Sequence, residues 1–215
     1  MNISACLRKA GLTGAFAIAS LVALHTGASA TTIKFDDLDG SGFDGHQITT
    51  PYMGYNWSNI YALGTDLKHI GPGYTNGIVS KKNIAYNGFA HESFVTKADS
   101  KLFLFGGGFF TAAYDDPDPG DIIKVHITGL LNGNKMYDLY IKLNTLGPQF
   151  VDIAKLLDGN VAIDKLRIAS VHQSQIVMDN LELTAVPIPA ALPLFGTALG
   201  FGALVLRRRK PAKAA

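Results

Sequence analysis

The middle of the chain consists of short runs of apolar and aromatic residues that are separated by Gly, Asn, Asp and Pro. Within Met136–Leu143, the apolar residues Leu139, Ile141 and Leu143 recur at every second position. Successive side chains of a strand point to opposite faces, so this period of two predicts a strand with one buried face. The same reasoning predicts ten strands: Thr32–Asp36, Gly77–Ser80, Asn83–Asn87, Glu92–Thr96, Lys101–Phe105, Phe109–Tyr114, Ile122–Thr128, Met136–Leu143, Val161–Ala169 and Gln175–Thr184.

These strands are expected to form an antiparallel β-sandwich, which makes this an all-β protein. No long segment has the period of 3.6 residues that an amphipathic helix needs, and only Val151–Leu157 is expected to form a helical turn. Asp115–Gly120 and Asn132–Asn134 have the composition of turns, and Gly106–Gly108 is expected to form a bulge or a sharp bend between two strands. We place this domain at residues 31–185, which is long enough for one hydrophobic core.

Residues 1–30 have the three parts of a secretory signal peptide. Arg8 and Lys9 precede the apolar stretch Ala10–Leu24, and the small residues Ala28–Ala30 follow a short break. We expect a signal helix, export by the Sec machinery and cleavage by signal peptidase after Ala30. The alternative is an uncleaved membrane helix, for which the apolar stretch is short.

Residues 186–215 contain a second apolar segment. The stretch Ala191–Leu206 is at the lower limit of length for a transmembrane helix, and Arg207, Arg208 and Arg209 follow it directly. Basic residues beside a membrane helix stay on the cytoplasmic side, so we expect this helix in the inner membrane with the domain outside. The alternative is a buried core helix, but an uncharged stretch followed by adjacent cations rarely packs inside a soluble domain.

Charge is distributed unevenly along the chain. Seven of the 19 basic residues lie in residues 1–30 and 186–215, which have no acids. Residues 31–185 therefore carry twelve basic and all 17 acidic residues, a net charge of −5. This argues against nucleic-acid binding, which needs a basic surface to neutralise phosphates. The single cysteine, Cys6, lies in the signal segment, so the domain is expected to have no disulfide and no cysteine nucleophile.

The C-terminal residues resemble a known sorting signal. Val186, Pro187, Pro189 and Ala190 form a Val-Pro-x-Pro-Ala motif, and the glycine-containing apolar stretch and the arginines follow it. This three-part order resembles the PEP-CTERM sorting signal. The resemblance implies processing by an exosortase, a membrane-embedded cysteine protease, and a location on the cell surface or in the matrix of a Gram-negative bacterium that makes an exopolysaccharide or biofilm. Ile188 stands where the commonest motif has Glu, which leaves the sortase subtype open.

The first and last predicted strands carry similar motifs, Phe35-Asp-Asp-Leu38 and Met178-Asp-Asn-Leu181. This bracketing resembles the passenger domains of PEP-CTERM proteins and jelly rolls of the galactose-binding type, which include carbohydrate-binding modules. The resemblance implies a jelly-roll topology with the first and last strands as neighbours.

Acidic residues in these two motifs have the oxygen atoms that Ca²⁺ prefers as ligands. Asp36, Asp37, Asp179 and Asn180 are therefore candidate ligands of a structural calcium ion that would connect the two ends of the domain. The alternative is that Asp36 and Asp179 accept hydrogen bonds from backbone groups in turns and at strand ends.

Aromatic residues gather between positions 52 and 61 and recur further along the chain. Aromatic faces stack on the C–H surfaces of sugars, and neighbouring amides orient hydroxyl groups. Tyr55, Trp57, Asn59, Tyr61 and Tyr74 are therefore candidate glycan ligands. The alternative is packing, since an isolated Trp in a sandwich more often belongs to the core.

Catalytic motifs are missing from the domain. Its histidines have no metal-binding spacing, no serine lies in a Gly-x-Ser-x-Gly motif, and Glu92 and Glu182 are its only glutamates. We expect a non-enzymatic exported protein that binds or supports exopolysaccharide. Two alternatives are an adhesive protein–protein interaction module and a glycan-acting enzyme that uses aspartates.

Overall fold

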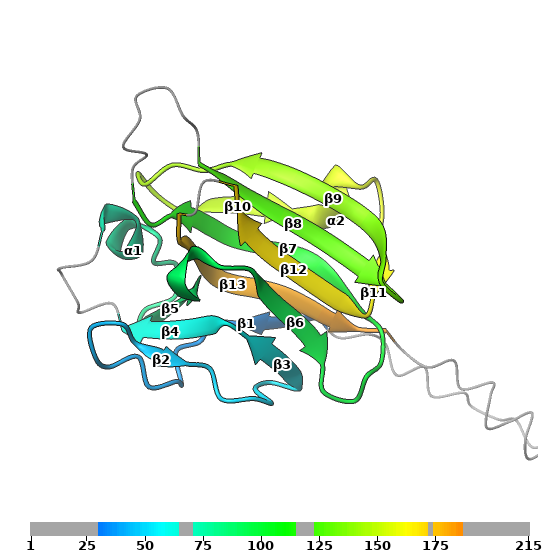
Figure 1. The fold of residues 1–215 in the computed structure, drawn as a ribbon, viewed down its shortest axis with the longest axis horizontal. Helices are drawn as coiled ribbons and strands as arrows, with labels where there is room; N and C mark the ends of the chain where they lie inside the picture. The colour runs from blue at the N-terminus through cyan, green and yellow to red at the C-terminus, as the bar shows by residue number, and fades with distance from the viewer. Residues whose placement is uncertain (1–29, 65–70, 115–122, 172–173, 187–215) are drawn as a thin grey trace, which may run out of the picture. The chain divides into compact units, whose positions relative to one another are not determined.

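The computed structural model describes residues 30–64, 71–114, 123–171 and 174–186, and all of them belong to one compact unit. Its strands form two antiparallel sheets, accompanied in the described ranges by only two short helices and one 3₁₀ turn (Figure 1). The predicted all-β sandwich is therefore confirmed. The predicted signal helix and transmembrane helix fall on residues 1–29 and 187–215, outside the described residues.

The larger sheet has eight strands and is organised around the last one, β13 (Ile176–Ala185), which pairs with three others. One of these is β1 (Ala30–Ile33), with Ala30 opposite Thr184, so the first and last strands are antiparallel neighbours as expected. The main path runs in the order β10 (Gln149–Asp152), β7 (Phe103–Ala112), β13, β5 (Asn83–Asn87), β4 (Ile60–Gly64) and β2 (His46–Gln47), and β11 (Ala162–Ile163) pairs with β7.

The smaller sheet has five strands, in the order β3 (Tyr55–Ser58), β6 (Ser93–Lys97), β12 (Lys165–Ser170), β8 (Lys124–Leu131) and β9 (Asn134–Lys142). Strands β8 and β9 form a hairpin whose two connecting residues, Asn132 and Gly133, both have positive φ, 51° and 79°. Such turns match the twist of the strands and favour Asn-Gly. The helical elements are α1 (Pro72–Asn76), α2 (Ile153–Leu156) and the 3₁₀ turn η1 (Gly88–Ala90).

The main core lies between the two sheets. Phe110 and Met178 of the larger sheet and Ile127, Leu166 and Ile168 of the smaller sheet are fully buried in one cluster. A second, smaller cluster covers part of the other face of the larger sheet: Leu63, Tyr74, Ile84, Tyr86, Ala113 and Val177. The outer face of the smaller sheet carries polar and charged side chains, and this face holds the candidate site.

Several sequence predictions were wrong in detail. The predicted strand Val161–Ala169 is two strands, β11 in the larger sheet and β12 in the smaller one. Gly77–Ser80 is not a strand, because the N–H groups of Val79 and Ser80 bond to a side-chain carboxylate and not to a neighbouring strand. The two strands predicted around Gly106–Gly108 are the single strand β7, and the irregularity predicted at these glycines is found as register shifts against β13 next to Gly107. Strands β3 and β4 are absent from the prediction, because the aromatic residues in them fit a binding patch as well as a strand.

Candidate functional site

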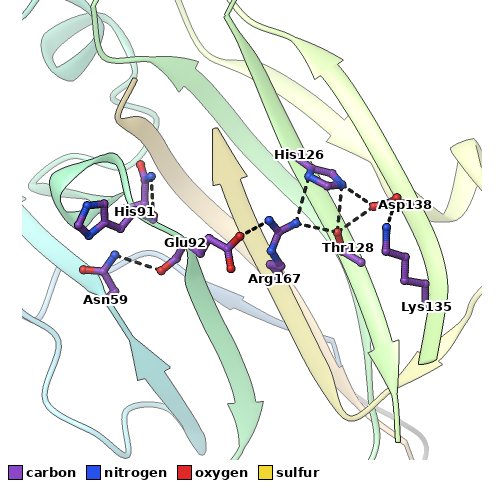
Figure 2. A network of polar contacts seen from close by, with 9 residues as sticks. Asn59, His91, Glu92, His126, Thr128, Lys135, Asp138 and Arg167 are labelled. Atoms are coloured by element: carbon purple, nitrogen blue, oxygen red, sulfur yellow. Dashed lines mark hydrogen bonds and ion pairs between the residues drawn. The ribbon is translucent and has the colours of Figure 1, made fainter. Parts of the chain in front are cut away.

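Polar side chains from three adjacent strands meet on the outer face of the five-stranded sheet (Figure 2). Arg167 on β12 lies opposite Thr128 on β8, and Thr128 lies opposite Asp138 on β9. His126 points to the same side, because alternate residues of a strand share a face. Ile127, between His126 and Thr128, is fully buried, so packing of the core holds its polar neighbours on the outer face.

The imidazole of His126 is hydrogen bonded through both nitrogens. Arg167 Nη1 lies 3.0 Å from Nδ1, and a guanidinium only donates, so Nδ1 accepts. The ring proton is therefore on Nε2, which donates to the carboxylate of Asp138. Asp138 also accepts from Lys135 Nζ at 2.7 Å and Thr128 Oγ1 at 2.9 Å. The hydrogen bonds from Lys135 and His126 hold the pKa of Asp138 well below its usual range.

Arg167 extends this network toward β6. Its Nη2 donates to the carboxylate of Glu92, the residue before β6, and this hydrogen bond lowers the pKa of Glu92 and raises that of Arg167. The backbone carbonyl of Glu92 accepts from Asn59 Nδ2 at 3.1 Å, and the same amide donates to the carbonyl of Gly88 at 3.0 Å. The polar network therefore runs from the β3–β4 connection across to β9 (Figure 2).

Tyr140 completes the site on β9. Its ring stacks on the imidazole of His126, with ring centroids 4.1 Å apart and planes inclined by 14°. Because both nitrogens of the imidazole are bonded, the imidazole is a fixed support for the phenol ring. Tyr140 is nevertheless 57% exposed, so an aromatic surface faces solvent beside an array of hydrogen-bonding groups.

A groove of about 740 Å³ adjoins Tyr140 where the edge strands β9 and β10 of the two sheets approach each other. Lys142 lines it from β9, Phe150 from β10, and Lys155 and Leu156 from α2. The groove thus combines aromatic and apolar surface with two cations and one carboxylate, that of Asp152, and it is open to solvent.

The titratable side chains of this network are engaged with one another. Neither nitrogen of His126 is free to take a proton from a nucleophile. Asp138 and Glu92 each accept from a cationic side chain, and their lowered pKa values are the opposite of what a general acid needs. What remains available to a ligand is the ring of Tyr140 and the nearby lysines.

The aromatic residues proposed from the sequence lie elsewhere. Trp57 is 3% exposed and Tyr55 4% exposed; both belong to the main core, and Trp57 Nε1 donates to the carbonyl of Tyr52 at 3.0 Å. Tyr74 is buried in the second cluster and Tyr61 packs against it. This placement favours core packing, which was the alternative to glycan binding. Of the five predicted glycan ligands, only Asn59 joins the network on the outer face.

The predicted calcium ligands are partly brought together. Asp179 is fully buried, and its carboxylate accepts from the N–H groups of Val79 and Ser80 at 2.9 and 2.7 Å. Burial raises the pKa of Asp179. Asp36 accepts from backbone N–H groups after Ser80, and Ser80 Oγ lies 3.1 Å from Asp36 Oδ1 and 3.0 Å from Asp179 Oδ1.

The side chains of Asp37 and Asn180, the other two predicted ligands, do not take part in this cluster, although the backbone N–H of Asn180 donates to Asp179 Oδ1 at 2.7 Å. Asp37 accepts from Tyr52 Oη at 2.5 Å, and the buried Oδ1 of Asn180 has no hydrogen-bond partner among the described residues. In the described ranges, no group of three or more His, Cys, Asp or Glu side chains is placed to hold a metal ion. An ion at Asp36 and Asp179 would therefore need carbonyl and hydroxyl oxygens as well.

The predicted processing residues are only partly described. Ala30 begins β1, and Val186 follows β13 and donates its N–H to the carbonyl of Leu102 at 3.2 Å. Pro187, Pro189, Ala190, Arg207, Arg208 and Arg209 lie outside the described residues. Among the helices that are described, none is long and apolar enough to cross a membrane.

Sequence reasoning missed the network on the outer face. The polar positions of the β9 pattern, Asp138, Tyr140 and Lys142, were the available signal, because they mark the solvent side of a half-buried strand. No protein-family model matches the chain, and no curated protein matches it.

Proposed function

We propose that this chain is an exported, non-enzymatic protein of the cell surface or extracellular matrix that binds exopolysaccharide through the outer face of its five-stranded sheet. The observation that carries the proposal is the exposed ring of Tyr140, held in place by His126 beside fixed hydrogen-bonding groups. The ring of Tyr140 has a partly negative face that suits the C–H surface of a sugar. Because His126 already holds this ring in place, less side-chain entropy is lost when the sugar binds.

Export and sorting are supported by the two ends of the sequence. The signal-peptide pattern precedes Ala30 and the PEP-CTERM-like motif begins at Val186. Because β1 and β13 pair with Ala30 opposite Thr184, both processing points flank the same end of the sandwich. Signal peptidase and an exosortase would then release or transfer the domain, with the C-terminal helix in the inner membrane beforehand. Mass spectrometry of the mature product should show a chain that begins at Thr31 and lacks Arg207–Arg209.

A structural calcium ion remains part of the proposal. Five oxygen atoms lie 3.0–3.4 Å from Ser80 Oγ, and its single proton can bond only one of them. They are the carboxylate oxygens of Asp36 and Asp179 and the carbonyls of Lys34 and Asn83. A cation bound beside Ser80 Oγ by these oxygens would connect the segments that follow the first strand and lie in the last one, in competition with the backbone N–H groups that the two carboxylates accept from.

Binding is tested with the purified full-length chain and the matrix polysaccharide of the producing cells. The chain should co-sediment with the polymer and release no new reducing ends. Tyr140→Ala should weaken binding about tenfold, because the aromatic contact is lost. Phe43→Ala is the matched control, since Phe43 is an exposed aromatic in the loop before β2. Equal binding by both variants would reject the site, and new reducing ends would indicate an enzyme.

A second candidate function is adhesion between proteins. Leu146, Phe150 and Leu156 are exposed apolar residues near the edge strands β9 and β10. Exposed apolar side chains at a sheet edge favour pairing with another chain. Sedimentation velocity over a range of concentrations separates the two functions: self-association that Phe150→Ser abolishes supports adhesion, and a monomer at all concentrations does not.

A further inference from the structure

The two sheets differ in charge. Strands of the five-stranded sheet contain one acid, Asp138, and six cationic residues, whereas strands of the eight-stranded sheet contain no Lys or Arg and three acids. The six cations are Lys97, Lys124, Lys135, Lys142, Lys165 and Arg167; the three acids are Asp152, Asp179 and Glu182. Positive charge is therefore concentrated on one sheet of a domain whose net charge is −5.

Three of these cations are already paired with acids. Lys97 contacts Asp99, Lys135 contacts Asp138, and Arg167 contacts Glu92. Within the described part of the chain, Lys124, Lys142 and Lys165 have no carboxylate at ion-pair distance, although Lys165 lies over the ring of Phe94.

Lys124 and Lys142 are directly opposite each other on β8 and β9. Like charges at opposite positions of an antiparallel pair destabilise the sheet, and among the described residues neither lysine is in an ion pair that would offset this cost. Such local conflicts are expected at functional sites, where binding compensates for them. An anionic group between the two ammonium groups would convert the repulsion into attraction.

The lysine pair lies next to the proposed sugar-binding surface. Lys142 follows Tyr140 by two residues on the same face of β9, which is about 7 Å along the strand. His126 and Lys124 stand in the same relation on β8. A sugar stacked on Tyr140 would therefore place a charged substituent within reach of both lysines, and Lys155 adds a third cation in the adjoining groove.

We infer that the polysaccharide bound at this face is anionic, with carboxylate or other acidic substituents that Lys124 and Lys142 hold beside Tyr140. This inference rests on the proposed function and names the class of its ligand. A nucleic acid is disfavoured as the polyanion because the basic area is small and local, and phosphate backbones require a broad basic surface.

The test compares one polymer in two charge states. The purified full-length chain is titrated with the matrix polysaccharide of the producing cells and with the same polysaccharide after carbodiimide-activated reduction of its carboxylates. We expect binding to the native polymer and at least about tenfold weaker binding to the reduced one, since hydrogen bonds to charged groups are about twice as strong as neutral ones. Lys142→Gln and Lys124→Gln should weaken binding to the native polymer by a similar factor, whereas Lys81→Gln, an exposed lysine outside both sheets, should not.

A second readout separates binding from folding. Because Lys124 and Lys142 repel each other, either glutamine variant should melt at the same temperature as the wild type or above it while binding more weakly. Equal binding of native and reduced polymer that is still lost in Tyr140→Ala would overturn the charge inference and leave the proposed function intact. Binding to neither polymer would overturn both, and binding of double-stranded DNA as tight as that of the native polymer would replace the polysaccharide with a nucleic acid.

Discussion

Ser80 directs both its backbone N–H and its side-chain hydroxyl toward the buried carboxylate of Asp179, at 2.7 Å and 3.0 Å. The two residues are 99 positions apart, so this contact ties the loop after α1 to the last strand. The carboxylate of Asp179 takes the place of a neighbouring strand as the acceptor for the N–H groups of Val79 and Ser80, so this segment is not part of a sheet. It also makes Asp179 a sensitive point of the fold.

Substitution of Asp179 should destabilise the domain according to how many donors are left without a partner. Asp179→Ala leaves the N–H groups of Val79 and Ser80 unbonded and should lower the free energy of unfolding by about 3 kcal/mol. Asp179→Asn keeps an acceptor oxygen and should cost less. Urea unfolding of the three proteins measures this, and equal stability of wild type and Asp179→Ala would contradict it.

The stability difference between the wild type and Asp179→Asn is expected to depend on pH. Burial raises the pKa of Asp179 in the folded state, so between its unfolded pKa, about 4, and its folded pKa the folded chain holds the proton more tightly. The stability of the wild type relative to Asp179→Asn should therefore fall as the pH rises through this interval and stay constant above it. Urea unfolding at a series of pH values follows the difference, and an increase over the interval would refute the assignment.

Calcium should stabilise the domain if it binds at Asp36 and Asp179. A ligand that binds only the folded state raises the melting temperature, with a stabilisation that grows as the logarithm of its concentration above Kd, and EDTA should reverse this. Asp36→Asn should abolish the response, whereas Asp99→Asn, an exposed acid away from Ser80, should retain it. Identical melting curves of the wild type in calcium and in EDTA would remove the ion from the account.

Trp57 is the only tryptophan of the chain, so its fluorescence reports directly on the core. We expect blue-shifted emission and weak quenching by acrylamide. Trp57→Ala should lower the free energy of unfolding by about 3–5 kcal/mol, because a large buried side chain is removed. Phe89→Ala, at an exposed aromatic, is the control and should change it by less than about 0.5 kcal/mol. Strong quenching in the folded chain would place Trp57 at the surface.

Buried tyrosines predict alkaline unfolding. Burial, and then the charge of Asp44, raise the pKa of Tyr86 to about 12, and its hydroxyl donates to the carbonyl of Asp44 at 2.5 Å. An unfolded tyrosine ionises near 10, so the unfolded state loses the proton first and stability should fall between about pH 10 and 12. Tyr86→Phe should reduce this slope at the expense of one hydrogen bond. Urea unfolding at each pH, together with tyrosinate absorbance, measures both effects.

The sequence predicts strands well where short apolar runs are bounded by turn residues. Strand β5 coincides with its predicted range and β13 is shifted by one residue, although all five residues of β5 and the first four of β13 are buried. Prediction from the sequence fails where distant residues determine the backbone conformation. The N–H groups of Val79 and Ser80 donate to a carboxylate that lies about a hundred positions later in the chain. Trp57 illustrates the same limit: its residue type allows either a sugar platform or core packing, and only the pairing of β3 with β6 places it inside.

The candidate site was less predictable than the fold. Its members come from β8, β9 and β12 and from the residue before β6, and the order of these strands in the sheet does not follow their order in the chain. Alternation alone identifies Asp138 and Tyr140 as solvent-facing. It does not reveal that Arg167, about thirty residues later, shares their face, because that requires the β8–β12 register.

Hydroxyl-radical footprinting of the full-length chain, with and without the matrix polysaccharide of the producing cells, tests the binding face most directly. Tyr140, Phe43 and Phe89 are all exposed aromatic residues, and only Tyr140 lies on the outer face of the five-stranded sheet. We expect the polymer to slow the oxidation of Tyr140 and to leave the oxidation rates of Phe43 and Phe89 unchanged. Unchanged oxidation of Tyr140 under conditions in which the polymer is bound would contradict it.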